Sequence, residues 1–344
     1  MKVKVGVNGY GTIGKRVADA ARMQSDIEVI GIVKTKPDYE ALSAVRNGFD
    51  LYVVEESAKK FEEKEVRFKG TLNDLLSKVD VIVDATPGGV GKTYKQLYEK
   101  YGIKAIFQGG EDADVAEISY STLCNHEEAY GRNSVRVVSC NTTGLLRLIC
   151  TLDKHYGVKK VRAVIVRRGA DPKEYTKGPI NSIVLDPPKV PSHHAADVRT
   201  VVPHVNIITT AVAVPTTLMH MHYVSLELKT NVSKGEVLDS LASSPRTLLV
   251  SSEDTGIKGT GQLVELARDL GRRRYDIPEL VIWEDTVTVV DGRELMLLQS
   301  VHQESIVVPE NIDAIRAVAK LEKSADATIE KTDKALGLLR GRLA

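Results

Sequence analysis

The sequence predicts an α/β protein that combines a Rossmann-type domain, built on a parallel sheet, with an α+β domain that has a mixed or antiparallel sheet. Two observations support this prediction. In the first half of the chain, short apolar runs without strict alternation are separated by helical segments, which is typical of a parallel sheet covered on both faces. In the second half, longer runs with partial alternation follow one another with few helices between them, which indicates a mixed or antiparallel sheet.

The strands expected in the first half are short and rich in β-branched residues. The first is followed by a glycine-rich turn and a helix whose apolar residues include Val17, Ala20 and Ala21. A second helix is expected near residues 92–101, after the third strand. In order, the expected strands are residues 2–8, 27–34, 79–86, 104–110 and 135–139.

The second half contains the longer strand candidates. They are interrupted by an irregular, proline-rich connection at residues 179–194. From Pro309 onward the chain is expected to be helical, because Ile312, Ile315 and Val318 recur at helical spacing. The expected strands are residues 161–168, 207–214, 219–228, 279–290 and 294–305.

Length, charge and cysteine content exclude several classes of protein. The 344 residues allow two domains, and a net charge of +1 gives no reason to expect binding to nucleic acid or to a membrane surface. No apolar run approaches the roughly 20 residues of a membrane helix, and no signal peptide is recognised, so a cytoplasmic protein is expected. Three cysteines without a C-x-x-C pair argue against a zinc site, and we expect no metal.

The loop GYGTIG follows the first strand and opens a helix, and it fits the pattern G-x-G-x-x-G. In such loops the first glycine permits a tight turn, the second lets the backbone approach a pyrophosphate, and the third lets helix and strand pack closely. The helix start adds free amides and a partial positive charge. We therefore expect a dinucleotide to contact Gly9, Gly11, Thr12 and Ile13.

The end of the second strand bears on the choice of dinucleotide. An acidic residue usually stands there to hold a ribose 2′-hydroxyl. Here the residues are Lys34, Thr35 and Lys36, and a cation suits a 2′-phosphate. The sequence therefore favours or at least tolerates NADP, with NAD left open, unless the lysines are simply solvated.

A second glycine-rich stretch, DATPGGVGKT, is close to the Walker pattern G-x-x-x-x-G-K-[ST]. The first position is Thr86 instead of glycine, so the loop cannot wrap a phosphate without obstruction by a Cβ atom. We expect a strand-to-helix turn in which Thr86 and Gly88 line the cofactor cleft and Lys92 is exposed in the first helical turn.

Cys140 lies where the strand VRVVS becomes a helix. Such a position lowers the pKa of a thiol and presents amides to an oxyanion, which suits a nucleophile; a buried structural cysteine is the alternative. Cys150 lies about 15 Å further along the helix, beyond disulfide reach of Cys140. Cys124 and Cys150 could pair with each other in a hyperthermophile, or both could be buried free thiols.

Six segments together resemble the archaeal type of phosphorylating glyceraldehyde-3-phosphate dehydrogenase, along essentially the whole chain. They are NGYGTIGKRV, SCNTTGLLR, VRRGADPKEYTKGPINS, PSHHAADV, PTTLMHMH and HQESIVVPENIDAIRA. The resemblance implies oxidation of glyceraldehyde 3-phosphate with inorganic phosphate and NAD or NADP through a cysteine thioester. It also implies a homotetramer, and we expect a dinucleotide domain of residues 1–139 and 304–344 around a catalytic domain of residues 140–303.

The reaction needs a nucleophile, a base and anion sites. Cys140 is expected to be the nucleophile. His220 and His222 share one face of a strand that is expected to be buried, and the resemblance implies that His220 is the base. His193 and His194 are expected in an irregular loop, where they suit binding of the substrate phosphate.

Further roles rest on the same resemblance. Arg167 and Arg168 end a strand and point to opposite faces, so that one can bind the substrate phosphate with the two loop histidines while the other approaches the cofactor. The resemblance assigns Arg168 to the cofactor and leaves Arg167 for the phosphate. The remaining contacts implied are Gly110 and Gln303 for the cofactor, the latter at the nicotinamide carboxamide, and Ser139 and Asn141 for the aldehyde.

Three alternatives remain at this stage. Another cysteine-dependent dehydrogenase of the same architecture, for aspartate semialdehyde or N-acetyl-glutamyl phosphate, would act on a carboxylate-bearing substrate. A non-catalytic dinucleotide- or RNA-binding module would need no thiol beside histidines and arginines. The third alternative is a metal site at His193, His194 and Asp197. Against it, the proposed chemistry needs no metal, and no carboxylate cluster accompanies these residues.

Overall fold

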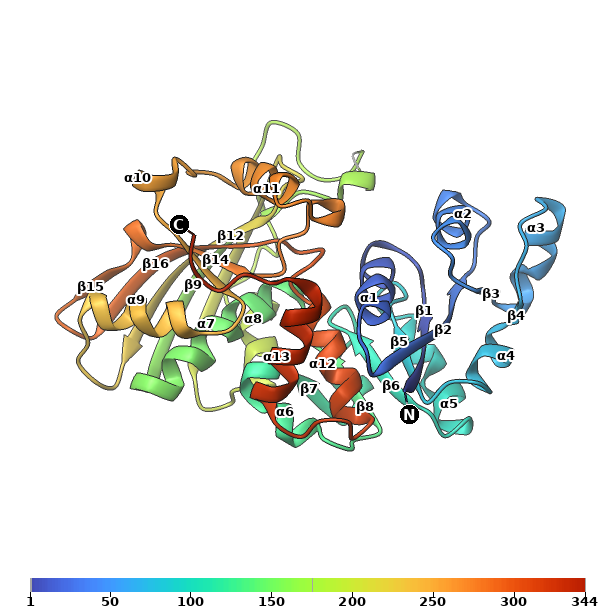
Figure 1. Cartoon of the computed structure of the whole chain (residues 1–344). Coiled ribbons are helices and arrows are strands. Elements are labelled where there is room, and N and C mark those ends of the chain that lie inside the picture. Colours follow the sequence, from blue (N-terminus) through green and yellow to red (C-terminus); the bar gives the residue numbers. More distant parts are fainter. Residues whose placement is uncertain (1, 175, 344) are drawn as a thin grey trace. The chain divides into compact units, whose positions relative to one another are not determined.

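The computed structural model describes residues 2–174 and 176–343. The chain forms two compact units, one of Met1–Ser139 with Val308–Gly337 and one of Cys140–Val307 with Leu338–Ala344 (Figure 1). The chain passes from the first unit to the second after Ser139. The return lies at residue 308 and not at 304, and residues 338–344 belong to the second unit because Gly341 and Arg342 form a short strand of its sheet.

The sheet of the first unit has eight strands, and all of its neighbouring pairs are parallel. The strand order is β4-β3-β2-β1-β5-β6-β8-β7, so the order reverses between β1 and β5. Ligands of such sheets bind outside the carboxyl ends of the strands at this reversal. The strands are β1 (Val3–Asn8), β2 (Ile27–Lys34), β3 (Leu51–Val53), β4 (Gly70–Thr71), β5 (Val81–Asp84), β6 (Lys104–Gln108), β7 (Ile118–Tyr120) and β8 (Ser134–Val137).

Most helices of the first unit pack against this sheet, whereas α13 packs on α12 and α6. Two of them come from the C-terminal part of the chain, and the first of these packs against α1, α6, β6 and β8. The helices are α1 (Thr12–Arg22), α2 (Tyr39–Arg46), α3 (Ala58–Glu63), α4 (Leu72–Leu76), α5 (Gly91–Lys100), α6 (Thr122–Ala129), α12 (Val308–Val318) and α13 (Ala325–Leu336). The helical C-terminal region is therefore interrupted between residues 318 and 325.

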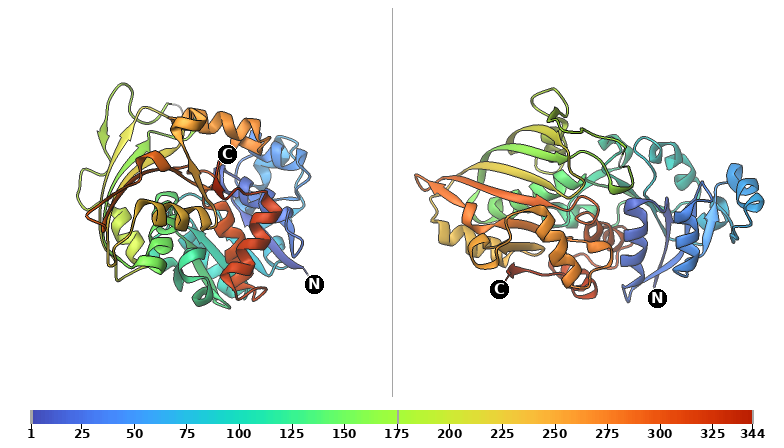
Figure 2. Two further views of the ribbon diagram at one scale, coloured as in Figure 1. Left: turned by 60° about the vertical axis from the view of Figure 1, so that its left-hand side comes forward. Right: turned by 90° about the horizontal axis from the view of Figure 1, so that it is seen from above.

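The second unit has a nine-stranded mixed sheet, as the sequence predicts. Its order is β10-β11-β9-β12-β16-β14-β13-β17, with β15 paired to β16. The strands are β9 (Val158–Arg168), β10 (Val184–Leu185), β11 (Asn206–Val214), β12 (His220–Leu228), β13 (Thr247–Val250), β14 (Leu280–Trp283), β15 (Thr288–Val290), β16 (Glu294–Val301) and β17 (Gly341–Arg342). The long central strands form one twisted layer (Figure 2).

One helix decides where the second unit places its chemistry. α7 (Cys140–Tyr156) packs against β9, β12 and β16. Its first turn, which begins at Cys140, therefore belongs to the layer that covers one face of these strands. The other helices are α8 (His193–Arg199), α9 (Lys234–Ser243), α10 (Ser252–Thr255) and α11 (Thr260–Asp269). Among the helices of the described residues, none is both long and apolar enough to cross a membrane.

Candidate active site

Cys140 is the first residue of α7, as predicted, and it follows β8 after two residues. Its side chain is partly exposed, and it is a free thiol. Cys124 and Cys150 are disulfide-bonded, so the alternative of two free thiols does not hold. Cys140 is therefore the cysteine that can act as a nucleophile.

The ionisation of Cys140 differs from the expectation. Burial raises the pKa of the thiol above its ordinary value of 9.0. The charges of Arg167 and Arg168 and the backbone amides of Asn141 and Cys140 itself favour the thiolate, but their combined effect is smaller than that of burial. The predicted lowering of the pKa was wrong because desolvation of the sulfur atom outweighs these favourable effects.

His220 begins β12 and is 2% exposed. Its pKa lies well below 6.5, because of burial first and then the electrostatic effects of His222, Arg168, Arg167 and His194, so the ring is neutral. The backbone N–H of Arg168 donates to Nδ1 of His220 over 2.9 Å. The proton of the neutral ring is then on Nε2, which can donate to a substrate oxygen. The neutral ring can take up a second proton only at Nδ1, which requires the hydrogen bond from the Arg168 amide to break.

Asn141 bridges two histidines instead of facing open space. Its Oδ1 accepts from Nε2 of His222 over 2.9 Å, and its Nδ2 lies 3.2 Å from Nε2 of His194. Burial lowers the pKa of each ring to about 3, with the charge of His193 as a further cause for His194. Gln299 donates to Nδ1 of His222. The Asn141 side chain therefore fixes two neutral rings, which leaves its backbone for the predicted substrate contact.

The two arginines at the end of β9 have different surroundings. Arg167 is about one-third exposed, and its Nη1 pairs with Asp186 Oδ2 at 2.6 Å. Arg168 is buried, with ion pairs to Asp171 and, at 2.8 Å, to Glu304. Opposite faces were expected from strand geometry. Arg167 is thus the arginine that a soluble anion can reach.

Gln303 is held by a residue that the sequence analysis did not single out. Its Nε2 donates to Asp171 Oδ1 over 2.8 Å, and Asp171 also pairs with Arg168. The Oε1 atom of Gln303 and the Nε atom of Arg168 are buried, and neither has a hydrogen-bond partner among the described residues. Both therefore have hydrogen-bonding capacity left for a bound group.

His193 and His194 lie in the first turn of α8 and not in an irregular loop, because Ser192 ends the extended segment and starts the helix. Their rings lie 3.9 Å apart, centroid to centroid. His194 is buried, with Nδ1 beside Ser192 Oγ, whereas His193 is exposed. Within residues 2–174 and 176–343, no group of three or more His, Cys, Asp and Glu side chains is arranged to hold a metal ion.

The dinucleotide loop of the first unit has the shape that its glycines predict. Gly9 has φ +97°, and a Cβ atom there would lie 2.7 Å from the Ala85 carbonyl oxygen. A Cβ at Gly14 would lie 1.8 Å from the Gly9 oxygen. Gly11 is the N-cap of α1 and supplies no side-chain cap, and Thr12 and Ile13 begin that helix. A helix start without a side-chain cap suits an anion.

Lys34, at the end of β2, is already paired. Its Nζ lies 2.9 Å from Glu40 and 3.1 Å from Asp38, and Lys15 also contacts Glu40 at 2.9 Å. Burial raises the pKa of Glu40, but the bonds and charges of Lys34 and Lys15 outweigh it and lower the pKa to about 2. Glu40 is ionised at neutral pH, so a 2′-phosphate would share Lys34 with two carboxylates.

Comparison with known proteins agrees with these two units. The family model of the glyceraldehyde 3-phosphate dehydrogenase C-terminal domain matches residues 139–268, and that of the dihydrodipicolinate reductase N-terminus matches residues 3–119. A glyceraldehyde-3-phosphate dehydrogenase of Aeropyrum pernix is 62% identical over 337 residues, 98% of each chain. Those of Hyperthermus butylicus and Sulfolobus acidocaldarius are 59% and 52% identical, with at least 99% of each chain covered.

The chain belongs to the glyceraldehyde-3-phosphate dehydrogenase family. This confirms the resemblance seen in the sequence, and the family's relatives are archaeal, as expected. The Rossmann-like parallel sheet supports binding of a nicotinamide dinucleotide, without a choice between NAD and NADP.

The Walker-like stretch has another use in this member of the family. The amides of Gly91 and Lys92, at the start of α5, donate to the two carboxylate oxygens of Glu111 at 2.9 and 3.2 Å. A carboxylate of the chain itself thus occupies the place where an NTPase loop would hold phosphate. Lys92 is exposed, as predicted, and pairs with Asp114.

Sequence reasoning missed the acidic partners of the site. Asp171, Asp186 and Glu304 hold Gln303 or one of the two arginines. A signal existed for two of them. Asp171 follows the arginine pair after two small residues, and Glu304 follows Gln303 directly. Nothing in the local sequence marked Asp186, which comes from the proline-rich connection.

Proposed function

We propose that the protein is a phosphorylating glyceraldehyde-3-phosphate dehydrogenase. It would oxidise glyceraldehyde 3-phosphate with inorganic phosphate and NAD or NADP to 1,3-bisphosphoglycerate. The observation that carries the proposal is a free thiol at the start of a helix whose ionisation is favoured by Arg167 and Arg168, two charges that also act on the buried, neutral His220. Family membership supports the same reaction.

The residues divide the work as follows. Sγ of Cys140, as a thiolate, forms a bond to the aldehyde carbon, and the oxygen becomes that of a thiohemiacetal. The electron pair of the C=O bond moves to this oxygen, and Nε2–H of His220 can donate a hydrogen bond to the resulting oxyanion. As the proposed base, His220 takes up the thiol proton of Cys140 at Nδ1 once the bond from the Arg168 amide is broken. Loss of hydride from the carbon leaves a thioester on Cys140. A phosphate oxygen then attacks the thioester carbon, and the thiolate leaves with the electron pair of the C–S bond.

Each of the two units contains residues that suit a nicotinamide dinucleotide. In the first unit, the backbone around Gly9 and Gly14 is packed so closely that a side chain at either position would clash with it. Gly110 follows β6 of the same sheet. In the second unit, Oε1 of Gln303 is a buried acceptor with no partner among the described residues, which suits an amide N–H. A bound nicotinamide would accept the hydride.

The anion sites follow from charge and access. Arg167 and the exposed His193 are proposed to hold the substrate phosphate, while His194 supports them from beneath. Ser139 and the backbone of Asn141 flank the thiol and are proposed to contact the aldehyde. Arg168 is proposed for the cofactor side, where its unpartnered Nε could donate.

The decisive experiment measures reduction of NAD and NADP with glyceraldehyde 3-phosphate, with and without inorganic phosphate, in the wild type and in Cys140→Ser. We expect turnover only in the wild type with phosphate. Turnover in the serine variant, or equal turnover without phosphate, would contradict the thioester route. Phosphate-dependent turnover of aspartate semialdehyde in place of the sugar phosphate would instead identify a carboxylate-specific relative.

The preference for NADP is tested at Lys34. Lys34→Ala should raise KM for NADP more than KM for NAD, because a 2′-phosphate loses a cation whereas a 2′-hydroxyl does not. Lys36→Ala is the matched control, since Lys36 is exposed two residues further on. Equal changes for both cofactors would remove Lys34 from the 2′-phosphate site.

We propose that four chains assemble. The connection at residues 179–194 exposes Ile180 by 85% and Ile183 by 70%, and Val164 and Tyr223 are exposed on the neighbouring strands β9 and β12. Exposed apolar groups in such number mark a protein contact. Light scattering coupled to size-exclusion chromatography should give the mass of four chains; the mass of one chain would contradict the assembly.

A further inference from the structure

Three buried polar side chains meet where the strand order of the first unit reverses. Asn8 ends β1, Asp84 ends β5, and Tyr98 lies in α5; they are 2%, 3% and 1% exposed. Nδ2 of Asn8 donates to the Tyr98 hydroxyl over 2.7 Å, and this hydroxyl donates to Oδ2 of Asp84 over 2.6 Å. One hydroxyl therefore joins the ends of two adjacent strands.

The other carboxylate oxygen of Asp84 holds the loop that follows β5. Oδ1 accepts from both the amide and the hydroxyl of Thr86. Asn8 stands directly before Gly9, the first glycine of the dinucleotide loop. The cluster is thus attached to both loops that lie at the reversal, one through Asn8 and one through Thr86.

The two loops have little freedom to adjust. Gly9 approaches Ala85 so closely that a Cβ atom would lie 2.7 Å from the Ala85 oxygen. A change in the separation of β1 and β5 would therefore alter the cradle for the pyrophosphate directly. Burial raises the pKa of the Tyr98 phenol well above its ordinary value, so the hydroxyl keeps the proton that it donates to Asp84.

We propose that Tyr98 is a positioning residue for the dinucleotide, which sets the spacing of the loops after β1 and β5 through Asn8 and Asp84. It touches neither cofactor nor substrate in this role. The inference rests on the proposed function, because it assumes that the loop Gly9–Gly14 binds a dinucleotide. It adds a residue of α5, distant in sequence from the loop, to the determinants of cofactor affinity.

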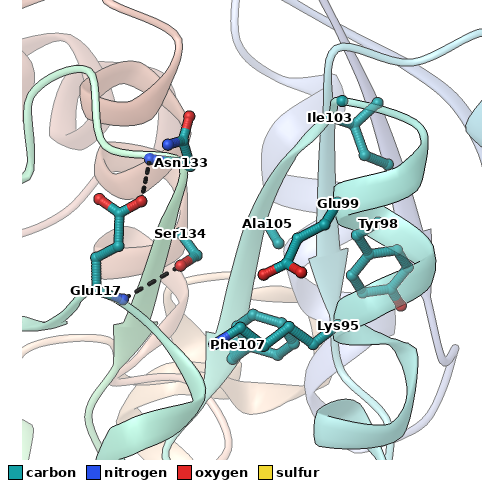
Figure 3. A pocket seen from close by; sticks show the side chains of 10 residues that line it. Lys95, Tyr98, Glu99, Ile103, Ala105, Phe107, Glu117, Asn133 and Ser134 are labelled. Atoms are coloured by element: carbon teal, nitrogen blue, oxygen red, sulfur yellow. Dashed lines mark hydrogen bonds between the residues drawn. The ribbon is translucent and has the colours of Figure 1, made fainter.

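The surroundings of Tyr98 make a clean test available. Its ring belongs to the wall of a pocket of about 380 Å³, beside Phe107 at 6.2 Å between centroids (Figure 3). Tyr94 stacks on the same ring at 6.0 Å, and the Tyr94 hydroxyl makes no hydrogen bond to any residue that the structure describes. Tyr98→Phe and Tyr94→Phe therefore remove the same atom from neighbouring rings, and only the first removes the link.

The experiment measures the dissociation constants of NAD and NADP by calorimetry in the intact protein. Tyr98→Phe should weaken binding of both by about 5- to 10-fold, since it leaves buried polar groups unpaired on each side of the lost hydroxyl. Tyr94→Phe should stay within about twofold of the wild type. With saturating cofactor, kcat of Tyr98→Phe and the alkylation rate of Cys140 should be nearly unchanged, because the second unit is not altered.

A second variant guards against a general loss of structure. Asp84→Asn should also weaken binding, because it disturbs the bonds to Thr86 as well as the bond from Tyr98. The double variant with Tyr98→Phe should lose less than the product of the two separate effects, since the two changes share the bond between Tyr98 and Asp84. Affinities of Tyr98→Phe equal to the wild type, an equal loss in Tyr94→Phe, or fully multiplicative effects would each overturn the inference. A wild type that binds no dinucleotide would instead overturn the proposed function.

Discussion

Cys140 has two opposing influences on its ionisation, and their balance gives its reactivity a pH dependence. Burial holds the pKa of the thiol above 9.0, while Arg167, Arg168 and two backbone amides oppose burial. Because the thiolate is the reactive form, only a small fraction of the free enzyme is reactive at neutral pH. The positive charges therefore limit the loss of reactivity without reversing it.

We expect the rate of Cys140 alkylation by iodoacetamide to rise steadily from neutral to alkaline pH, without a plateau near pH 7. Arg167→Gln should move the midpoint to still higher pH, because the cation that favours the thiolate is removed. Arg162→Gln, on the same strand, is the control and should not move it. Alkylation followed by mass spectrometry measures this directly, and a midpoint below pH 8 in the wild type would contradict the raised pKa.

At the scale of one element, α5 begins with a carboxylate in place of a bound anion. Glu111, from the turn after β6, is 7% exposed and accepts both amides at the helix start. A negative charge in this position satisfies unpaired donors and interacts favourably with the helix dipole. The helix that carries Tyr98 is therefore anchored at its first turn by a residue outside it.

Glu111→Ala should lower the free energy of unfolding by about 1–2 kcal/mol, the usual cost of losing a capping group. Asp114→Ala is the control, since its ion pair with Lys92 is exposed and should contribute little. Denaturant unfolding of the two variants measures the difference. Equal stability of Glu111→Ala and the wild type would show that water replaces the carboxylate at no cost.

The elements also show what a sequence can and cannot predict. β2 was predicted with the bounds Ile27–Lys34 that the structure has, because a long β-branched run carries a strong pattern. β4, of two residues, carries none. The local pattern predicts Cys140 at a helix start, but it does not predict the raised pKa, because α7 packs against strands that are distant in the sequence. Likewise, the seven-residue helix that begins at His193 was read as a loop.

At the scale of the whole chain, the first unit is completed by residues from the C-terminal region. All eleven residues of α12 are buried. Arg316, in this helix, pairs with both carboxylate oxygens of Asp26 at 2.8–2.9 Å and also bonds to Gln24 and Thr332. A buried arginine with four side-chain hydrogen bonds thus joins the segment after α1 to α12 and α13.

Arg316→Met should lower the free energy of unfolding by about 3–5 kcal/mol, because it breaks a buried network and leaves the acceptors of Arg316 without a donor. Lys331→Met, which removes an exposed ion pair with Glu322, should change it little. Thermal and denaturant unfolding measure both. A loss below 1 kcal/mol in Arg316→Met would show that the network contributes no net stability.

The same network predicts an effect of acid. Burial raises the pKa of Asp26, but the bonds and charge of Arg316 outweigh it and bring the pKa below 3.8. The contribution is then present above pH 3.8 and is lost as the pH falls through the lower folded value. The stability difference between the wild type and Asp26→Asn should shrink on acidification below this pH; a constant difference would contradict it.

The chain leaves the first unit after Ser139 and returns to it at Val308, and this path decides the order in which the ribosome synthesises the two units. Residues 1–139 emerge first, yet α12 and α13, which belong to the same unit, are translated after residues 140–307 of the second unit. The N-terminal segment must therefore wait, with apolar surface uncovered, until residue 337 has left the exit tunnel. During synthesis, residues 140–307 of the second unit emerge before the first unit can be completed, so the apolar surface of the nascent N-terminal segment needs shielding for that time.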